Sequence, residues 1–263
     1  MKICEYHRPQ TLDEALALLS RSEIVTIPLG GGTFINSPAF PAEQLPSAGV
    51  AVVDLQAIGL NNIERNGTYI GIGATLSLQA FLDTPGLPEA LYRAIRNETT
   101  YNLRQVATLA GTLVAADGRS SFATVMLALD ARLTLLPGDE VISLGDLLPL
   151  RSERLRGRLI TKVTIPAAVR LAYESVARTP ADRPLVCAAL ARWHSGRTRL
   201  AMGGYGPAPV LAMDGPEPGG VEVAARAVYS LAGDEWANAA YRSDVAGVLA
   251  RRCLDNLDIP GET

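Results

Sequence analysis

Two glycine-rich loops contain the residues of this sequence that are best suited to bind a ligand. The first reads PLGGGTF (residues 28–34) and ends an apolar run, and the second reads TLAGT (residues 108–112). Because glycines carry no Cβ, backbone N–H groups at such positions can converge on an anion. The hydroxyl of Thr33 is a further donor suited to a phosphate oxygen. Together the loops predict two facing segments that clasp a pyrophosphate.

The spacing of the glycines excludes the commoner nucleotide sites. Neither loop is followed by a Lys-Ser or Lys-Thr pair at the spacing of a P-loop. The GxGxxG fingerprint of dinucleotide-binding folds is not completed, and IGIGAT (residues 70–75) lacks its third glycine. The hydrolase motifs G-x-S-x-G and H-E-x-x-H do not occur. Each loop taken alone is also typical of a tight turn, so both interpretations stay open at this point.

The cysteine and histidine content limits the metal chemistry. The three cysteines, Cys4, Cys187 and Cys253, lie far apart, and the only histidines are His7 and His194. An iron–sulfur cluster needs about four cysteine ligands, so we expect no cluster, no metal site and no disulfide framework in this chain. No side chain is singled out as catalytic.

Charge and hydropathy argue against nucleic acid and membranes as partners of this chain. The chain has 24 basic and 27 acidic residues and a formal net charge of −3. It therefore lacks the excess of positive charge typical of proteins that bind nucleic acid. The first ten residues lack the apolar region of a signal peptide, and no apolar run reaches the roughly 18 residues of a membrane span. We therefore expect a cytoplasmic protein without membrane insertion.

The apolar pattern predicts an α+β fold in three parts. Thr11 and Glu14 have the spacing of a capping box, and β-rich runs at 24–29 and 50–55 complete an α/β subdomain over residues 1–57. Alternating residues at 63–78 and helical spacing at 121–131 indicate a β-rich second subdomain over residues 58–168. Residues 169–263 predict a C-terminal α+β domain, with a three-stranded antiparallel sheet (171–178, 185–193 and 198–206) followed by helices in 221–257. The arginine-rich stretch at 151–158 is typical of a solvated basic loop.

Six segments in the same order resemble one enzyme family over essentially the whole chain. They are YHRPQTLDEALALL, LGGGT, LRQVATLAGTL with the ALDA that follows, LITKVTIP, AYESVAR and MGGYGPAPVLA. The sequence resembles the FAD-binding (medium) subunit of the molybdenum hydroxylases, of the carbon monoxide dehydrogenase and xanthine dehydrogenase type. The fold that this resemblance implies is a two-subdomain FAD-binding fold (PCMH-like) with a C-terminal α+β domain.

The resemblance implies an FAD site between the first two subdomains. Its residues would be Leu29, Gly30, Gly31, Gly32, Thr33 and Phe34 in the first loop and Thr108, Leu109, Ala110, Gly111 and Thr112 in the second, with Asp117, Ser121 and Ile160 nearby. The implied partners are a large molybdopterin-containing subunit and a small [2Fe–2S] subunit, with NAD or a quinone as the acceptor. The implied function is electron transfer from the partner's clusters to that acceptor, while substrate is oxidised in a partner chain.

The sequence departs from the family pattern at several of these positions. Ala110 and Thr112 stand where the family usually has Gly-Gly-Asn or Gly-Gly-Ser, and Ser121 aligns with a usual acid, which leaves Asp117 as the nearby carboxylate. Ser175 replaces a common lysine. These departures support an alternative, a flavin-free scaffold subunit of the same kind of complex. An unrelated nucleotide-binding domain is a third reading.

Overall fold

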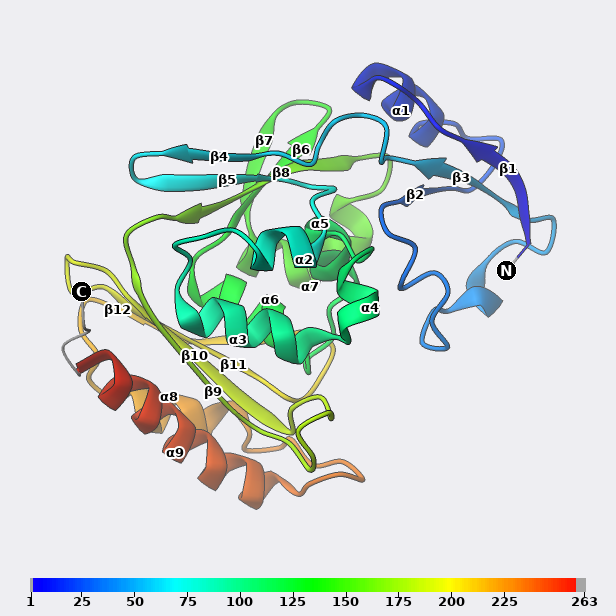
Figure 1. Cartoon of the computed structure of the whole chain (residues 1–263). Coiled ribbons are helices and arrows are strands. Elements are labelled where there is room, and N and C mark those ends of the chain that lie inside the picture. The colour runs from blue at the N-terminus through cyan, green and yellow to red at the C-terminus, as the bar shows by residue number, and fades with distance from the viewer. Residues whose placement is uncertain (1, 259–263) are drawn as a thin grey trace.

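The computed structural model describes residues 2–258, which form three β-sheets and the helices that cover them (Figure 1). The first sheet is parallel, with strand order β1-β3-β2, and consists of β1 (Ile3–His7), β2 (Thr26–Leu29) and β3 (Val50–Asp54). Helix α1 (Leu12–Leu19) packs on it, and the short 3₁₀ helix η1 (Ala42–Gln44) lies in the loop after β2. Thr11 Oγ1 accepts the Glu14 N–H at 3.2 Å, so the predicted cap at the start of α1 is present.

A five-stranded antiparallel sheet with order β4-β5-β8-β6-β7 follows. Its strands are β4 (Ile63–Asn66), β5 (Tyr69–Gly73), β6 (Arg132–Leu136), β7 (Glu140–Ser143) and β8 (Leu159–Pro166). The helices of this region are α2 (Leu78–Leu82), α3 (Glu89–Glu98), α4 (Tyr101–Arg104), α5 (Leu109–Ala115), α6 (Ser121–Ala128) and α7 (Leu144–Arg154). Helix α6 is buried over its whole length, which explains why its sequence is apolar on every face.

The third sheet is antiparallel, as predicted, but it has four strands rather than three. Its order is β12-β11-β10-β9, formed by β9 (Arg170–Val176), β10 (Val186–Arg192), β11 (Thr198–Gly203) and β12 (Val210–Gly215). The missed strand β12 lies at the edge and exposes Val210 and Leu211, so it lacks the buried apolar pattern that reveals a central strand. Helices α8 (Val221–Val228) and α9 (Ala239–Asp258) occupy the segment predicted to be helical.

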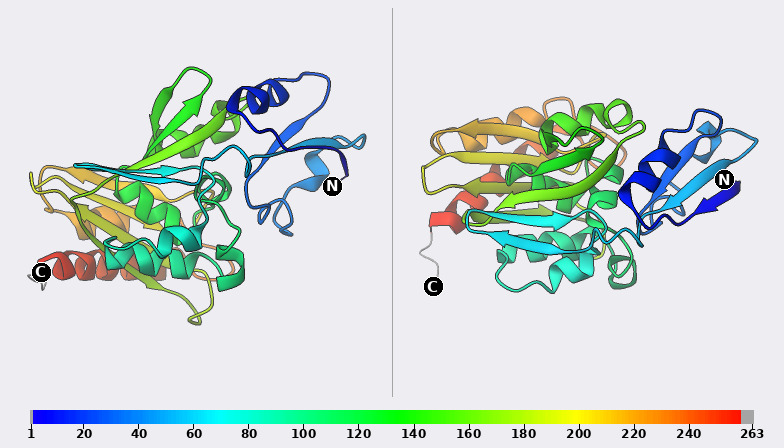
Figure 2. Two further views of the ribbon diagram at one scale, coloured as in Figure 1. Left: turned by 45° about the horizontal axis from the view of Figure 1, so that its top comes forward. Right: turned by 90° about the horizontal axis from the view of Figure 1, so that it is seen from above.

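The second and third sheets share the central helices. Helices α3 and α6 lie between them, and α8 and α9 cover the far face of the third sheet (Figure 1). Figure 2 shows the first sheet and α1 set to one side of this pair. The loops that follow β2 and precede α5 therefore lie where the first sheet meets the helices of the second (Figure 1).

Two further elements differ from expectation. Strand β1 was not predicted, because it is an edge strand whose side chains are mostly exposed and show no apolar run. The arginine-rich stretch expected to be a solvated loop begins inside α7, which includes Arg151 and Arg154. Ser143 caps this helix by accepting the Asp146 N–H at 3.1 Å. The spacing of Ser143 and Asp146 indicates a helix start, but the prediction rested on the arginines alone.

Candidate functional site

The two glycine loops lie in direct contact. A Cβ built on Gly31 would lie 1.7 Å from the backbone oxygen of Val106, and one built on Gly30 would lie 2.5 Å from Thr108 Oγ1. No side chain larger than hydrogen fits at either position without displacement. The glycines of the first loop thus allow its backbone to lie against the residues that open the second loop.

The backbone of the first loop presents several N–H groups. Within residues 2–258, the N–H groups of residues 30–34 donate no hydrogen bond, whereas the Gly30 and Gly32 oxygens accept bonds from the side chains of Gln56 (3.1 Å) and Asn36 (3.0 Å). Gly32 has a φ of 71°, which favours glycine. A row of N–H donors in such a turn is an arrangement that binds anions.

The second loop differs, because its N–H groups are already bonded. Leu109 N donates to Leu76 O at 2.8 Å and Ala110 N donates to Ala74 O at 3.1 Å. Gly111 N donates to Thr108 Oγ1 at 3.3 Å, and Thr112 N donates to Thr108 O at 2.9 Å. Unlike residues 30–34, residues 109–112 therefore have no N–H group left to offer a ligand.

Thr108 is the group of the second loop that faces the first. It is buried, and its Oγ1 lies between Gly30 and Gly111, since a Cβ on either glycine would approach it within 2.7 Å. The oxygen accepts the Gly111 N–H, and among residues 2–258 its own O–H donates to no acceptor. A buried hydroxyl hydrogen without an acceptor fits a site that receives an anionic oxygen.

A family model confirms the class of protein. The model described as "FAD binding domain in molybdopterin dehydrogenase" matches residues 2–168. The chain belongs to this family. Membership confirms the expected cofactor, FAD, and the expected class, an oxidoreductase subunit.

Individual relatives extend the similarity beyond the matched region. The chain is 26% identical to the carbon monoxide dehydrogenase medium chain of Afipia carboxidovorans over an alignment of 279 positions that covers 95% of each chain. It is 28% identical over 201 residues to YgfM of Escherichia coli K12, covering 76% of this chain and 74% of that protein. A glyceraldehyde dehydrogenase medium chain of Sulfolobus acidocaldarius is 26% identical over 80% of this chain and 78% of its own length.

Solved structures show the same fold. A Cu,Mo-CO dehydrogenase superposes with a TM-score of 0.81 at 23% identity, covering 96% of both chains. Quinoline 2-oxidoreductase from Pseudomonas putida 86 superposes with a TM-score of 0.80 at 19% identity, again covering 96% of both chains. The predicted FAD-binding fold with a C-terminal α+β part is thus confirmed.

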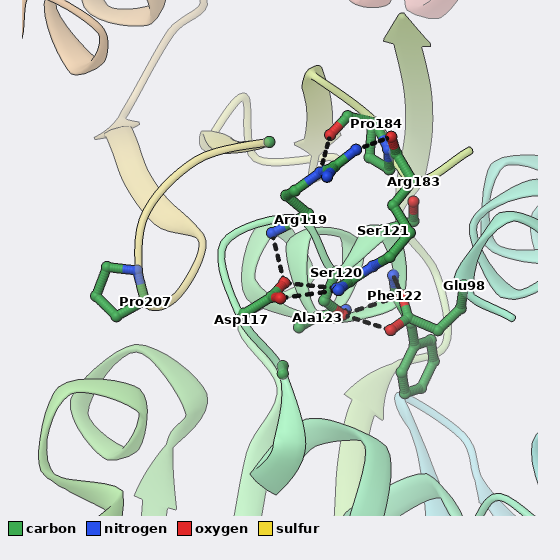
Figure 3. A network of polar contacts seen from close by, with 12 residues as sticks. Glu98, Asp117, Arg119, Ser120, Ser121, Phe122, Ala123, Arg183, Pro184 and Pro207 are labelled. Carbon is green, nitrogen blue, oxygen red and sulfur yellow. Dashed lines mark hydrogen bonds and ion pairs between the residues drawn. The ribbon is translucent and has the colours of Figure 1, made fainter. Parts of the chain in front are cut away.

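Asp117 and Ser121 lie beyond α5 and contact the C-terminal part of the chain. The Asp117 carboxylate accepts two bonds from Arg183, at 2.8 and 2.5 Å (Figure 3). Ser121 is fully buried, and Tyr173 donates its hydroxyl to Ser121 Oγ at 2.7 Å. Burial raises the pKa of Tyr173, which keeps its hydroxyl protonated as a donor. The structure thus brings together Gly30, Gly31 and Thr108, and it places Asp117 and Ser121 in a second polar network.

Ile160 is joined to the second loop through the backbone. It lies in β8 opposite Leu135, and its side chain is buried in the core of the middle region. The neighbouring Thr161 oxygen accepts the Ala74 N–H at 3.1 Å, and Ala74 O in turn accepts the Ala110 N–H. Two backbone hydrogen bonds therefore link this strand to the start of α5.

Glu98, which the sequence did not single out, supplies a carboxylate at the start of α6. Its carboxylate accepts the Phe122 N–H at 2.8 Å and the Ser120 hydroxyl at 3.0 Å (Figure 3). The N-terminus of a helix stabilises negative charge, but burial is the larger effect and raises the pKa of Glu98. This carboxylate lies beside Ser121, the position at which the sequence lacks the usual acid. Nothing near Glu98 in the sequence predicts the contact, which joins residues 24 apart.

The residues that the structure describes form neither a cluster of metal ligands nor a membrane-spanning helix. Among residues 2–258, no three His, Cys, Asp or Glu side chains converge as metal ligands. In that same range, no helix combines the length and the apolar character needed to cross a membrane.

Proposed function

We propose that this chain is the FAD-binding electron-transfer subunit of a heteromeric molybdenum hydroxylase. It would receive electrons from iron–sulfur clusters of a small partner subunit, while a large molybdopterin-containing partner oxidises the substrate. The acceptor would be NAD or a quinone. The observation that carries this proposal is the contact of Gly30 and Gly31 with residues 106–108, which joins the two loops that the resemblance assigns to one cofactor.

In the proposed site, the first loop binds the diphosphate and the second loop adds one hydroxyl donor. The N–H groups after Leu29, together with the Thr33 hydroxyl, would hold the diphosphate, because these N–H groups have no acceptor in the described part of the chain. Thr108 would add its hydroxyl, and Ile160 would lie toward the isoalloxazine ring. When bound, FAD supplies a redox centre that accepts electron pairs and passes them on. The proposed set is Leu29, Gly30, Gly31, Gly32, Thr33, Phe34, Thr108, Leu109, Ala110, Gly111, Thr112, Asp117, Ser121 and Ile160.

The cysteine content supports the proposed division of labour, in which a partner carries the iron–sulfur clusters. A [2Fe–2S] cluster takes four protein ligands, usually cysteines, and this chain has three cysteines in all. Cys187 and Cys253 are buried, while Cys4 is exposed. The carbon monoxide and glyceraldehyde dehydrogenase relatives carry the description "medium chain", which supports a place among other subunits.

The direct test is FAD binding by the purified chain. We expect it to carry FAD after purification or to bind it on titration, seen as visible flavin absorbance and a change in flavin fluorescence. The variant Thr108→Val keeps the size of the side chain and removes the hydroxyl, and should weaken binding about tenfold, the cost of one hydrogen bond to a charged group. Absence of flavin after reconstitution of a folded chain would contradict the proposal.

A flavin-free scaffold subunit is the second candidate. The observation that favours it is the bonding of all four N–H groups of residues 109–112 within the protein, together with Ala110 and Ser121 in place of the usual residues. This candidate predicts a folded chain that assembles with the large and small partners yet binds no flavin. The same titration, repeated on the assembled complex, separates the two candidates.

A further inference from the structure

Four of the five residues between α5 and α6 form a segment that packs against the C-terminal part of the chain. In this linking segment (residues 116–119), Gly118 N donates to Gly206 O at 2.8 Å, and Gly118 O accepts the Gly204 N–H at 2.5 Å. A Cβ on Gly118 would lie 1.8 Å from the oxygen of Tyr205. The linking segment is therefore pressed backbone to backbone against the loop between β11 and β12.

The side chain of Arg183, in the loop between β9 and β10, binds the same segment (Figure 3). Its guanidinium donates two bonds to the Asp117 carboxylate, the fork geometry that gives an ion pair direction as well as energy. Arg119 completes the contact in the reverse sense, because its guanidinium donates to the backbone oxygens of Arg183 (2.5 Å) and Pro184 (3.0 Å). The linking segment and the loop between β9 and β10 thus each donate hydrogen bonds to the other through an arginine side chain.

Arg151, from α7, holds the end of α5 itself. It donates to Ala116 O at 2.5 Å and to Pro207 O at 3.2 Å. Ala116 is the C-cap of α5, so the guanidinium lies at the negative end of the helix and satisfies the oxygen of its capping residue. The same side chain joins α5 to the loop between β11 and β12.

Helix α5 carries these contacts to the first glycine loop. The helix has seven residues and spans about 10 Å. Its N-terminal cap is Thr108, the residue whose hydroxyl lies against Gly30. A helix this short moves as one body, so a shift of Ala116 would also move Thr108.

We propose that Arg183 and Arg151 are positioning residues of the flavin site. They fix the linking segment and hence set where α5 presents Thr108 to the first loop, so both arginines control flavin affinity without touching the cofactor. This inference rests on the proposed function for its effect on FAD. Its structural part, the fixing of α5 by Arg183 and Asp117, stands independently.

The test is a double-mutant cycle on the Arg183–Asp117 pair. We expect Arg183→Ala and Asp117→Ala each to weaken FAD binding at least about fivefold, the lower end of coupling between sites. The double variant should bind no more weakly than either single variant, since the two side chains act as one unit. Arg183→Lys keeps the charge without the fork and should restore binding in part. Hydrogen exchange of residues 109–115 in the flavin-free chain should accelerate in the variants that weaken binding.

The control is Arg154→Ala. Arg154 pairs with Glu140 at 2.9 Å and is 43% exposed, which matches Arg183 at 42%, but it makes no contact with the linking segment. Arg183 and Asp117 variants that equal this control in FAD affinity and in exchange of α5 would overturn the inference. Loss of affinity that adds up in the double variant would also overturn it. Failure of the wild type to bind FAD would reject the proposed function, and the exchange data would then still decide whether the pair fixes α5.

Discussion

Gly31 and Val106 lie so close that a Cβ on Gly31 would be 1.7 Å from the Val106 oxygen. Real Cβ atoms do not approach backbone oxygens to this distance, so Gly31→Ala must push the two loops apart. We expect this variant to lose FAD binding by at least about tenfold, because correctly placed donors lose most of their effect when displaced by about 1 Å. Flavin fluorescence titration, with circular dichroism to confirm folding, measures the effect.

The matched control for this substitution is Gly233→Ala. A Cβ on Gly233 would lie 3.7 Å from its nearest neighbour, Ala239 N, an ordinary contact distance. This variant should bind FAD as the wild type does. Equal affinity of both variants would show that contact between the loops does not matter for the cofactor.

Restoring the usual family residue should be tolerated at position 112 but should destabilise the folded chain at position 121. Thr112 is only partly buried, so Thr112→Asn should be tolerated, and the added amide should strengthen FAD binding in a flavin fluorescence titration. Ser121 is fully buried beside the carboxylate of Glu98, so Ser121→Asp would bury a second negative charge. We expect Ser121→Asp to cost about 3 kcal/mol, by analogy with uncompensated buried charges, and to lower Tm by about 5 °C or more.

Thermal unfolding followed by circular dichroism checks this contrast. Adding Glu98→Gln to Ser121→Asp removes the neighbouring charge and should recover part of the loss. A Tm for Ser121→Asp equal to that of the wild type would mean that the start of α6 accommodates two carboxylates.

The local patterns of the sequence predicted the parts of the fold that local chemistry determines. The cap at Thr11, the buried strands and the long C-terminal helices each have a signal within a few residues of chain. The contact of Gly31 with Val106 joins residues 75 positions apart, and no local pattern gives such a pairing, which was expected from the shared glycine and threonine chemistry of the two loops and from the resemblance. Glu98 and Arg151 escaped prediction for a related reason, since a charged residue near a helix end is normally solvated, and only the tertiary fold brings each against a distant backbone group.

Cysteine reactivity provides an independent check of the packing. Burial raises the pKa of Cys187 to about 12 and also raises the pKa of Cys253, and the thiolate is the reactive form. We expect one thiol of the three, Cys4, to react with a maleimide at pH 7.5 in the native chain, and all three to react after unfolding. Cys4→Ser should abolish the native reaction. Rapid labelling that persists in this variant would contradict the buried position of β10 or of α9.

The raised pKa of Glu98 predicts how stability depends on pH. Because burial favours the protonated form, the folded state binds more protons than the unfolded state between the ordinary pKa of about 4.3 and the folded value. The contribution of Glu98 to stability is therefore complete below that window and declines as pH rises through it. Arg183 and Asp117 are the charged neighbours, and Arg183 offsets part of the shift.

Glu98→Gln removes the titrating group while its amide oxygen can still accept the Phe122 N–H. The variant should therefore gain stability relative to the wild type as the pH is raised from 4 to 7.5, which urea unfolding at several pH values measures. Glu89→Gln, an exposed carboxylate at the start of the same helix, controls for the substitution itself. Glu98→Ala should instead cost about 1–3 kcal/mol at pH 4, because it leaves the Phe122 N–H and the Ser120 hydroxyl without an acceptor. A difference between wild type and Glu98→Gln that stays constant with pH would show that the carboxylate titrates normally and is not desolvated in the folded chain.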